Sequence, residues 1–264
     1  MKTVVVTGST RGIGRGLAEA FLKHGCAVVV NGRNAQSVDE TVTDLAGVCG
    51  TDRVFGQACD VAHADQVQAL WDAACAKFGS VDIWINNAGV THDALPFWSV
   101  DMDRVEQVFD VNVLGSINGL RTAYRGMAAQ GGGSIYNMEG LGSGKRAVKG
   151  LAFYESSKSA VTKLTQTAVL DAEGSAVKIG YLSPGMVITD LLVGEEQSGE
   201  KWERKKRIYN ILADRVETVA PFLAEEVLKN ETHGAKIAWL TPWKSFMRFL
   251  KAPFVKRDLF AEEE

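Results

Sequence analysis

A short apolar run, followed at once by a glycine-rich turn and a helical pattern, opens the chain. Residues 3–7 read TVVVT, and Gly8, Gly12 and Gly14 lead into the amphipathic stretch 14–24. A buried strand, a glycine turn and a helix in this order bring backbone N–H groups and the positive helix end beside a bound pyrophosphate. The spacing is GxxxGxG rather than GxGxxG, so the motif on its own is also compatible with a simple tight turn.

The same alternation of apolar runs and helical patterns continues along the chain. The expected strands are 3–7, 27–31, 53–57, 81–86, 133–138, 177–182 and 235–240. Helical stretches between them include 14–24, 35–47, 64–77, 101–129 and 153–172. Strands separated by helices indicate βαβ units, and runs such as VVV are typical of strands buried on both faces. We therefore predict an α/β fold with one Rossmann-type, doubly wound parallel sheet of about seven strands and helices on both faces.

Length and composition suit one globular domain. The chain has 264 residues, of which 46% are hydrophobic and 23% are charged. We expect a single dinucleotide-binding catalytic domain over 1–264, with a substrate-lid insertion around 190–220 and an atypical amphipathic extension around 240–264. The charge-dense run within the insertion would be an exposed loop or helix, and its Trp202 and Tyr209 would form part of the lid.

Charge and cysteine usage exclude several other classes. The formal net charge is −3, whereas nucleic-acid-binding domains carry a strong basic footprint. The four cysteines form no CxxC pair and the four histidines are scattered, so we expect no metal site, no disulfide framework and a reducing compartment. We see neither a leader pattern nor a run of about 18 apolar residues. We expect a soluble cytoplasmic protein, or a plastid protein if a transit peptide has been removed.

The end of the second expected strand indicates which dinucleotide would bind. NAD-binding folds place a carboxylate there for the ribose 2′-hydroxyl. This chain reads VVVNGRN, with Arg33 near that position and Arg11 inside the glycine turn. Two cations without an acid favour a 2′-phosphate and hence NADP(H), although both arginines could instead be solvated surface groups. Asp60 could accept a hydrogen bond from the adenine amino group, and the small Ala88 and Gly89 could let the backbone approach the ribose.

Four motifs then occur in the order found in one large superfamily. They are TGxxxGIG from Thr7, NNAG from Asn86, Asn112 within DVNVLGS, and YxxxK at Tyr154 and Lys158. The chain resembles the short-chain dehydrogenase/reductase superfamily from residue 3 to about residue 190, including SPGMVITD at 183–190. Motifs and resemblance together predict these cofactor-binding residues: Gly8, Ser9, Arg11, Gly12, Ile13, Gly14, Arg33, Asp60, Val61, Asn87, Ala88, Gly89, Tyr154, Lys158, Pro184, Gly185, Val187 and Thr189.

The second half of the chain carries a narrower resemblance. NMEGLGSG, SPGMVITDLLV and the two segments ETVAPFL and GAKIAWLTPWK are similar to the chlorophyll b reductase family of the non-yellow-colouring type. That resemblance implies reduction of the formyl group of chlorophyll b by NADPH, giving 7-hydroxymethyl chlorophyll a. A homologue could instead reduce another carbonyl, such as a 3-oxoacyl, steroid or sugar carbonyl.

Tyr154 and Lys158 stand four residues apart, so on a helix they share one face. A lysine ammonium beside a phenol favours the phenolate and lowers its pKa from about 10 towards working pH. Tyr154 would then act as general acid towards the carbonyl oxygen, or as base in the reverse direction. In the superfamily's arrangement Lys158 also holds the nicotinamide ribose, and Asn112 fixes a water that passes protons to the lysine.

One catalytic residue of the superfamily is missing. Members usually read NISS at the end of the fifth strand, and the second serine hydrogen-bonds the substrate carbonyl. Here Asn137, Met138, Glu139 and Gly140 stand there, so Gly140 takes the serine's place. Ser143 could supply the hydroxyl, a protonated Glu139 could contribute, the contact could be absent, or the glycines could make room for a bulky planar substrate. The non-enzyme alternative is a catalytically weak NADP(H)-binding sensor module.

The C-terminal stretch is amphipathic and basic. Apolar residues recur at helical spacing, namely Trp243, Phe246, Met247, Leu250 and Phe254, and basic residues occupy another face, namely Lys244, Arg248 and Lys251. Such a helix could pack on its own core or on a sister subunit of a homodimer or homotetramer, cover an apolar pocket, or lie on a membrane surface. We expect the partner to be a large, apolar small-molecule carbonyl or alcohol substrate.

Overall fold

Parallel strands form the sheet that the alternating pattern predicts. The computed structural model describes residues 1–144, 147–194, 199–255 and 257–260. Within those residues the main sheet has the order β3-β2-β1-β4-β5-β6-β9, and each neighbouring pair is parallel. Its strands are β1 (Thr3–Val6), β2 (Ala27–Gly32), β3 (Val54–Ala58), β4 (Ile83–Asn86), β5 (Gly133–Met138), β6 (Val177–Ser183) and β9 (Lys236–Ala238). The predicted fold class is confirmed.

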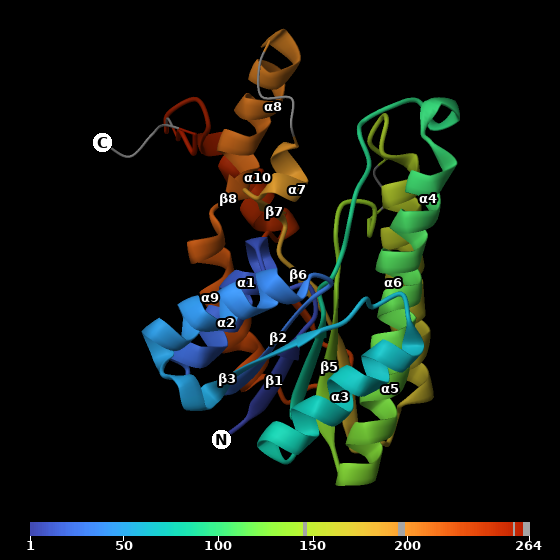
Figure 1. Ribbon diagram of the computed structural model, residues 1–264. Coiled ribbons are helices and arrows are strands. Elements are labelled where there is room, and N and C mark those ends of the chain that lie inside the picture. The colour runs from blue at the N-terminus through green and yellow to red at the C-terminus, as the bar shows by residue number, and fades with distance from the viewer. Residues whose placement is uncertain (145–146, 195–198, 256, 261–264) are drawn as a thin grey trace.

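Helices cover both faces of this sheet, as Figure 1 shows. One layer contains α1 (Gly12–Lys23), α2 (Ala35–Cys49) and α9 (Val216–Lys229). The other contains α3 (Ala64–Phe78), α4 (Met102–Phe109), α5 (Gly115–Gln130) and α6 (Ala152–Asp171). Side chains of a strand alternate between faces, so Val4 and Val6 enter the first apolar cluster and Val5 enters the second. The continuous apolar run of β1 is therefore buried on both sides.

The predicted helix 101–129 is interrupted by a π-helical turn. Residues Asp110–Leu114 join α4 to α5 with the wider hydrogen-bond spacing of a π-helix. Asn112 lies in the middle of this turn and is 1% exposed. Single π-turns inside long helices often occur at functional sites, and this one places an asparagine of the expected catalytic set.

A smaller subassembly stands beyond the carboxyl end of β6. It consists of β7 (Met186–Val187), α7 (Asp190–Val193), α8 (Gly199–Leu212), β8 (Ala213–Asp214) and α10 (Pro242–Lys251). Trp202 and Tyr209 are buried here against Phe260, with ring centroids 5.1 and 6.3 Å from it. These two aromatic side chains form the core of this subassembly, and the expectation that they form part of a substrate lid stays a prediction. Residues 195–198 of the expected insertion, and 256 and 261–264 of the expected extension, lie outside the described residues.

Helix α10 turns its charged face towards the protein. Buried Asp214 pairs with Arg248 and Arg257, each at 2.7 Å, and accepts a hydrogen bond from the Trp239 indole at 2.6 Å. Lys244 lies with its Nζ 3.0 Å from the centre of the Trp239 ring. The apolar residues point outwards, with Trp243, Phe246, Leu250 and Phe254 exposed by 69, 53, 52 and 87%. Packing of this apolar face on the domain's own core, one of the expected alternatives, is therefore wrong.

No helix among the described residues is both long and apolar enough to cross a bilayer. Within the same residues, no group of three histidine, cysteine or carboxylate side chains is arranged to hold a metal ion. All four cysteines are free, and burial raises the pKa of the Cys59 thiol to about 12. A thiol in such an apolar setting is unreactive, because the thiolate is the nucleophilic form.

Candidate active site

The glycine turn and the loop after β4 are hydrogen-bonded into one platform. The Thr7 hydroxyl accepts from the backbone N–H groups of Asn87 and Ala88 at 3.0 and 3.1 Å. In return the Asn87 side-chain amide donates to the carbonyls of Thr7 and Gly8 at 2.8 and 3.1 Å. Asn87 and Ala88, both predicted cofactor contacts, thus lie against the first predicted contact, Gly8. Two motifs that are about 80 residues apart in sequence form one surface.

Glycine is required in this turn for two physical reasons. Gly8 and Gly12 have φ angles of 63° and 55°, a region that side chains disfavour. A Cβ at Gly14 would lie 2.3 Å from the Gly8 carbonyl oxygen, so only glycine lets α1 approach the strand. The N-cap residue of α1, Arg11, makes no side-chain cap hydrogen bond, which leaves the first N–H groups of α1 to be satisfied by an anion or solvent.

The segment after β6 reaches over the glycine turn. Thr189 lies so close to Gly12 that a Cβ there would be 3.4 Å from the threonine Cγ2. Gly185 has a φ of 74°, and a Cβ on it would lie 2.4 Å from the Leu240 Cβ. Pro184 and Val187 are buried beside it. This turn carries the predicted nicotinamide-end residues from β6 to the N-terminal end of α1.

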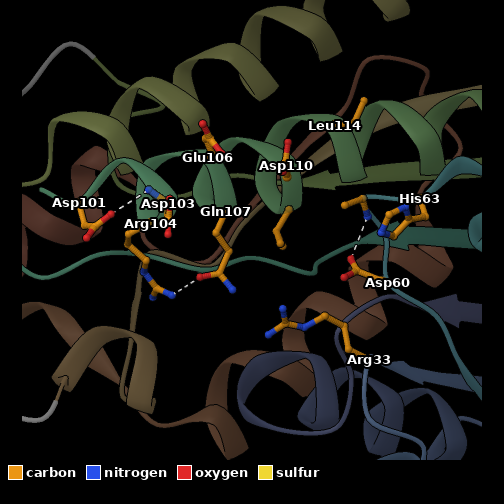
Figure 2. A pocket seen from close by; sticks show the side chains of 12 residues that line it. Arg33, Asp60, His63, Asp101, Asp103, Arg104, Glu106, Gln107, Asp110 and Leu114 are labelled. Atoms are coloured by element: carbon orange, nitrogen blue, oxygen red, sulfur yellow. Dashed lines mark hydrogen bonds between the residues drawn. The ribbon is translucent and has the colours of Figure 1, made fainter.

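A cavity of about 850 Å³ lies at the other end of the platform, between the ends of β2 and β3 and helix α4. Figure 2 shows Arg33 and Asp60 on one side of this space and the Gln107 side chain of α4 pointing into it from the other. Asp60 accepts from the Ala62 N–H at 3.1 Å, which fixes its carboxylate at the rim. Tyr154 and Lys158 do not line this cavity, which lies instead beside Arg33 and Asp60, the residues predicted to bind the adenosine end of the cofactor.

The two arginines predicted to bind a 2′-phosphate are not equivalent. Arg33 lines the cavity, beside Asp60 and His63. Arg11 is not among the residues of that lining, and its guanidinium lies 4.0 Å from the Asp190 carboxylate on α7. Both groups of that pair are largely exposed, so the interaction is weak. Of the two arginines, only Arg33 thus lines the cavity at the ends of β2 and β3.

Three of the predicted cofactor residues have side chains committed to the protein interior. Ser9 is fully buried, and its hydroxyl donates to the Val6 carbonyl at 2.7 Å and accepts from the Asn31 N–H at 2.9 Å. Val61 packs in the core beside Gly115, whose Cβ would lie 2.6 Å from it. Ile13 packs against the other apolar cluster. Since these side chains hold the loops in place, any contact they make with a cofactor must come from their backbone.

Tyr154 and Lys158 are buried on one face of α6, with 8% and 6% exposure. Lys158 donates from Nζ to the Met138 carbonyl at 3.3 Å, which ties it to the end of β5. Burial lowers the pKa of Lys158 to about 8, and the negative charge of Glu139 opposes that shift. Burial raises the pKa of Tyr154 to about 12.

The Tyr154 pKa does not lie below its ordinary value, where the spacing with Lys158 predicts it, because burial raises it. Loss of solvation penalises the phenolate, and that penalty dominates the titration of Tyr154. A tyrosine that keeps its proton near neutral pH can donate it to a carbonyl oxygen, so the environment favours the general-acid role over the general-base role.

Asn112 connects three elements rather than facing open space. Its Oδ1 accepts from the Val90 N–H at 2.8 Å, and its Nδ2 donates to the Val90 carbonyl and the Ser157 hydroxyl, both at 2.9 Å. A Cβ on neighbouring Gly89 would lie 3.4 Å from Asn112 Oδ1 and 3.6 Å from Lys158 Nζ. The Asn112 side chain thus holds the π-turn, the loop after β4 and helix α6 together around Lys158. The expected role of Asn112 in holding a water stays a prediction.

Gly140 stands at the position of the missing serine, and Ser143 lies beside it. A Cβ on Gly140 would lie 2.7 Å from the Tyr154 Oη, so Gly140 touches the phenol directly. The Ser143 hydroxyl accepts from the Gly140 N–H at 3.2 Å and keeps its own hydrogen for another acceptor. Glu139 lies 2.6 Å from Lys236 Nζ, so its carboxylate is engaged by an ammonium group of β9. Lys145 and Arg146 of the same loop lie outside the described residues.

Sequence reasoning missed a histidine and a buried polar chain behind the site. His92 Nε2 accepts from the Tyr154 N–H at 3.3 Å, which ties the loop after β4 to the catalytic helix. Beneath the site, hydrogen bonds of 2.7 to 2.8 Å connect Trp84, Asn86, Asn137 and Thr165 in that order. Polar residues at the ends of adjacent parallel strands were a signal for this hydrogen-bonded series. Its members are distant in sequence, so the pairing itself could not be predicted.

Comparison with known proteins gives a consistent picture. A family model described as short chain dehydrogenase matches residues 2–199. The chlorophyll(ide) b reductase NOL, chloroplastic, of Oryza sativa subsp. japonica is 36% identical over 272 residues, which cover 99% of this chain and 78% of that protein. The probable chlorophyll(ide) b reductase NYC1, chloroplastic, of the same organism is 33% identical over 279 residues, covering 100% of this chain and 54% of that protein. The chain thus spans about half the length of NYC1.

A solved structure supports the fold and the cofactor class. Gluconate 5-dehydrogenase from Burkholderia cenocepacia, in complex with NADP and tartrate, superposes with a TM-score of 0.77 at 26% identity. The superposition covers 90% of this chain and 93% of that one.

Proposed function

Because this chain belongs to the short-chain dehydrogenase family and is an NAD(P)-dependent oxidoreductase, we propose that it uses NADPH to reduce a carbonyl on a large apolar substrate. The formyl group of chlorophyll b, reduced to the hydroxymethyl group of 7-hydroxymethyl chlorophyll a, is the substrate that we favour. The observation that carries the proposal is the buried, proton-retaining Tyr154 four residues from Lys158, with Gly140 in contact with the phenol.

The residues around the glycine turn fit NADP(H). The turn offers close backbone approach and the uncapped N-terminus of α1 for a pyrophosphate. Arg33 lines the adenine-end cavity and forms no ion pair with a carboxylate of the described residues, which suits a phosphate on the adenosine ribose. Gly89 leaves room beside Lys158 for the nicotinamide ribose. We propose NADPH over NADH on the strength of Arg33.

When bound, the nicotinamide supplies the hydride, and the protein's own groups handle the proton and the orientation. Tyr154 would donate its Oη proton to the carbonyl oxygen as negative charge develops there. Lys158, held by the Met138 carbonyl, would stabilise the phenolate left behind. Ser143 would donate its free hydroxyl hydrogen to the same carbonyl oxygen, in place of the superfamily's serine.

A large apolar substrate is supported by the loop after β4. This loop is tied to Tyr154 through His92, and beyond that anchor it exposes an apolar patch. The patch consists of Leu95, Phe97, Trp98 and Met102, which are 40, 61, 75 and 61% exposed. Phe97 and Trp98 stack edge to face with centroids 4.9 Å apart. Exposed apolar patches of this kind often mark binding surfaces, and this one leads to the catalytic helix.

Turnover of purified chlorophyll b with NADPH tests the proposal. We expect conversion to 7-hydroxymethyl chlorophyll a, identified by its absorption spectrum and mass, together with NADPH oxidation. Tyr154→Phe should abolish both while NADPH binding, followed by fluorescence, persists. Oxidation of NADPH with 3-oxoacyl, steroid or sugar carbonyls but not with chlorophyll b would replace the substrate. NADPH binding without turnover of any carbonyl would favour the sensor module.

Assembly and location follow as smaller proposals. We propose a homodimer or homotetramer in which the outward apolar face of α10 is covered by a sister subunit, with contact to a membrane surface as the alternative. Light scattering on the purified protein distinguishes a dimer from a tetramer, and co-sedimentation with lipid vesicles tests the membrane alternative. We propose the cytoplasm or a plastid as the location, the latter because the curated reductases compared above are described as chloroplastic.

A further inference from the structure

Glu139, at the end of β5, directly follows Met138, whose carbonyl accepts a hydrogen bond from Lys158. The backbone N–H of Glu139 donates to the Leu182 carbonyl at 2.8 Å, so residue 139 continues the pairing of β5 with β6. Side chains alternate along a strand, and that of Asn137 faces α6, where it donates to Thr165. The side chain of Glu139 therefore points to the same layer, which contains Lys158.

The Glu139 carboxylate is almost fully enclosed. Its side chain is 4% exposed, and its Oε2 lies 2.6 Å from the Nζ of Lys236 on β9. Lys236 itself is 53% exposed and reaches inwards from the last strand of the sheet. A buried carboxylate is unfavourable unless it is paired, so such a group is seldom retained for stability alone.

Several ionisable groups surround Lys158, and they differ in their effect on it. Tyr154 lies on its own helix, Glu139 follows β5, Tyr181 lies on β6 and Lys236 on β9, while His92 in the loop after β4 faces the Tyr154 amide. Of these, Glu139 supplies the charge that opposes the loss of Lys158's proton on burial. Burial raises the pKa of Tyr181, and the charge of Glu139 raises it further. The field of Glu139 therefore extends over this part of the sheet.

We propose that Glu139 is a positioning residue of the reaction, which keeps Lys158 protonated beside Tyr154, and that Lys236 limits the strength of this effect. The inference rests on the proposed function, because Lys158 has a task only if Tyr154 transfers a proton. The short pair with Lys236 places a positive charge 2.6 Å from the Glu139 carboxylate and moderates its field. In the superfamily's NISS pattern an uncharged residue stands here, so this chain replaces a neutral neighbour of the lysine by a charged one.

The direct test is a titration of Lys158 by NMR of protein labelled with ¹³C at lysine Cε, with the signal identified from Lys158→Met. Glu139→Gln keeps the shape and removes the charge, and should lower the pKa of Lys158 by about one unit or more. Glu139→Asp should restore part of that shift. Lys236→Met removes the opposing cation, and should move the pKa in the opposite direction. The two variants are expected to shift the Lys158 pKa in opposite directions. Either variant alone therefore tests the proposal if the other does not fold.

Glu225→Gln is the matched control. Glu225 pairs with Lys229 at 2.6 Å, the same distance as the Glu139 pair, but the carboxylate is 51% exposed and lies on α9. This control should leave Lys158 unchanged. An unaltered Lys158 pKa in Glu139→Gln, or a downward shift in Lys236→Met, would overturn the proposal.

Turnover provides the second measurement. In Glu139→Gln, kcat should be close to wild type near pH 6 and about tenfold lower near pH 9, because a neutral Lys158 no longer stabilises the phenolate. A uniform loss of kcat at all pH values would indicate a merely structural role and contradict the proposal. If chlorophyll b proves not to be the substrate, the NMR titration still decides the role of Glu139, so the two failures are distinguishable.

Discussion

Restoring the superfamily's serine at Gly140 should harm this protein rather than improve it. Gly140→Ser returns a hydroxyl to the position from which other members contact the substrate carbonyl. On that argument alone the variant would gain one donor, and such donors are worth about 3 kcal/mol in well-studied sites. The structure opposes this gain, because the Cβ of any residue at this position would lie 2.7 Å from the Tyr154 Oη.

The magnitude follows from the overlap. Ordinary van der Waals contact begins at 3.4 Å, so the phenol must move by about 0.7 Å. The Cγ and Cε of Lys158 lie 3.2 Å from the same Cβ, so the lysine is pushed as well. A misplacement of about 1 Å in a catalytic group costs roughly a hundredfold in rate. We therefore expect kcat to fall about tenfold to a hundredfold, or roughly 1.4 to 2.7 kcal/mol.

Steady-state kinetics with NADPH and the turned-over carbonyl is the assay, and two further variants complete it. Gly140→Ala adds the Cβ without the hydroxyl and should lose about as much activity as Gly140→Ser. Gly144→Ser is the matched control, because a Cβ at Gly144 has nothing within 4 Å. It adds the same side chain to the same loop and should leave kcat unchanged. A Gly140→Ser enzyme faster than wild type, with Gly140→Ala unimpaired, would refute the reasoning.

Four further results are expected. Arg33→Ala should weaken NADPH binding about tenfold with NADH binding little changed, measured by fluorescence titration; equal losses would contradict the 2′-phosphate assignment. Ser143→Ala should lower kcat about a hundredfold if its hydroxyl contacts the carbonyl, whereas an unchanged rate would mean that the loop only shapes the pocket. The rate of reduction should fall as pH rises through about 8, where Lys158 loses its proton, and not near 12, where Tyr154 does. Asp214→Asn should lower the free energy of unfolding by about 3 kcal/mol in urea, since it leaves two arginines without their shared carboxylate; an unchanged midpoint would contradict this.

Local patterns were sufficient for the sheet and for the nucleotide-binding turn. The strand β5 was predicted at 133–138 and is observed at Gly133–Met138, because apolar alternation and glycine punctuation are properties of neighbouring residues. The glycine turn is similar, since its φ angles and close approaches exclude side chains at those positions. The spacing of Tyr154 and Lys158 likewise puts both on one helical face without any knowledge of distant contacts.

Side-chain partners that are distant in sequence could not be predicted in this way. Ser9 matched a cofactor motif, yet its hydroxyl bonds to the backbone of β1 and β2. Arg11 was grouped with Arg33 by charge, but it lies beside Asp190, whose position depends on the path after β6. The π-turn around Asn112 depends on hydrogen bonds to the loop after β4 and to α6, which no helical pattern encodes.

The sequence by itself determined the order of strands and helices, the phosphate-binding turn and the identity of the tyrosine and lysine, because each depends on periodicity or short spacing. The tertiary structure decided the proton affinities and the orientations. Burial sets the pKa of Tyr154 and Lys158, and Glu139 acts on the lysine only because β5, β6 and β9 align side by side. The charged face of α10 turns inwards because Asp214, on β8, is buried beneath it. Desolvation and pairing across the sheet are properties of the assembled chain, so no stretch of sequence contains them alone.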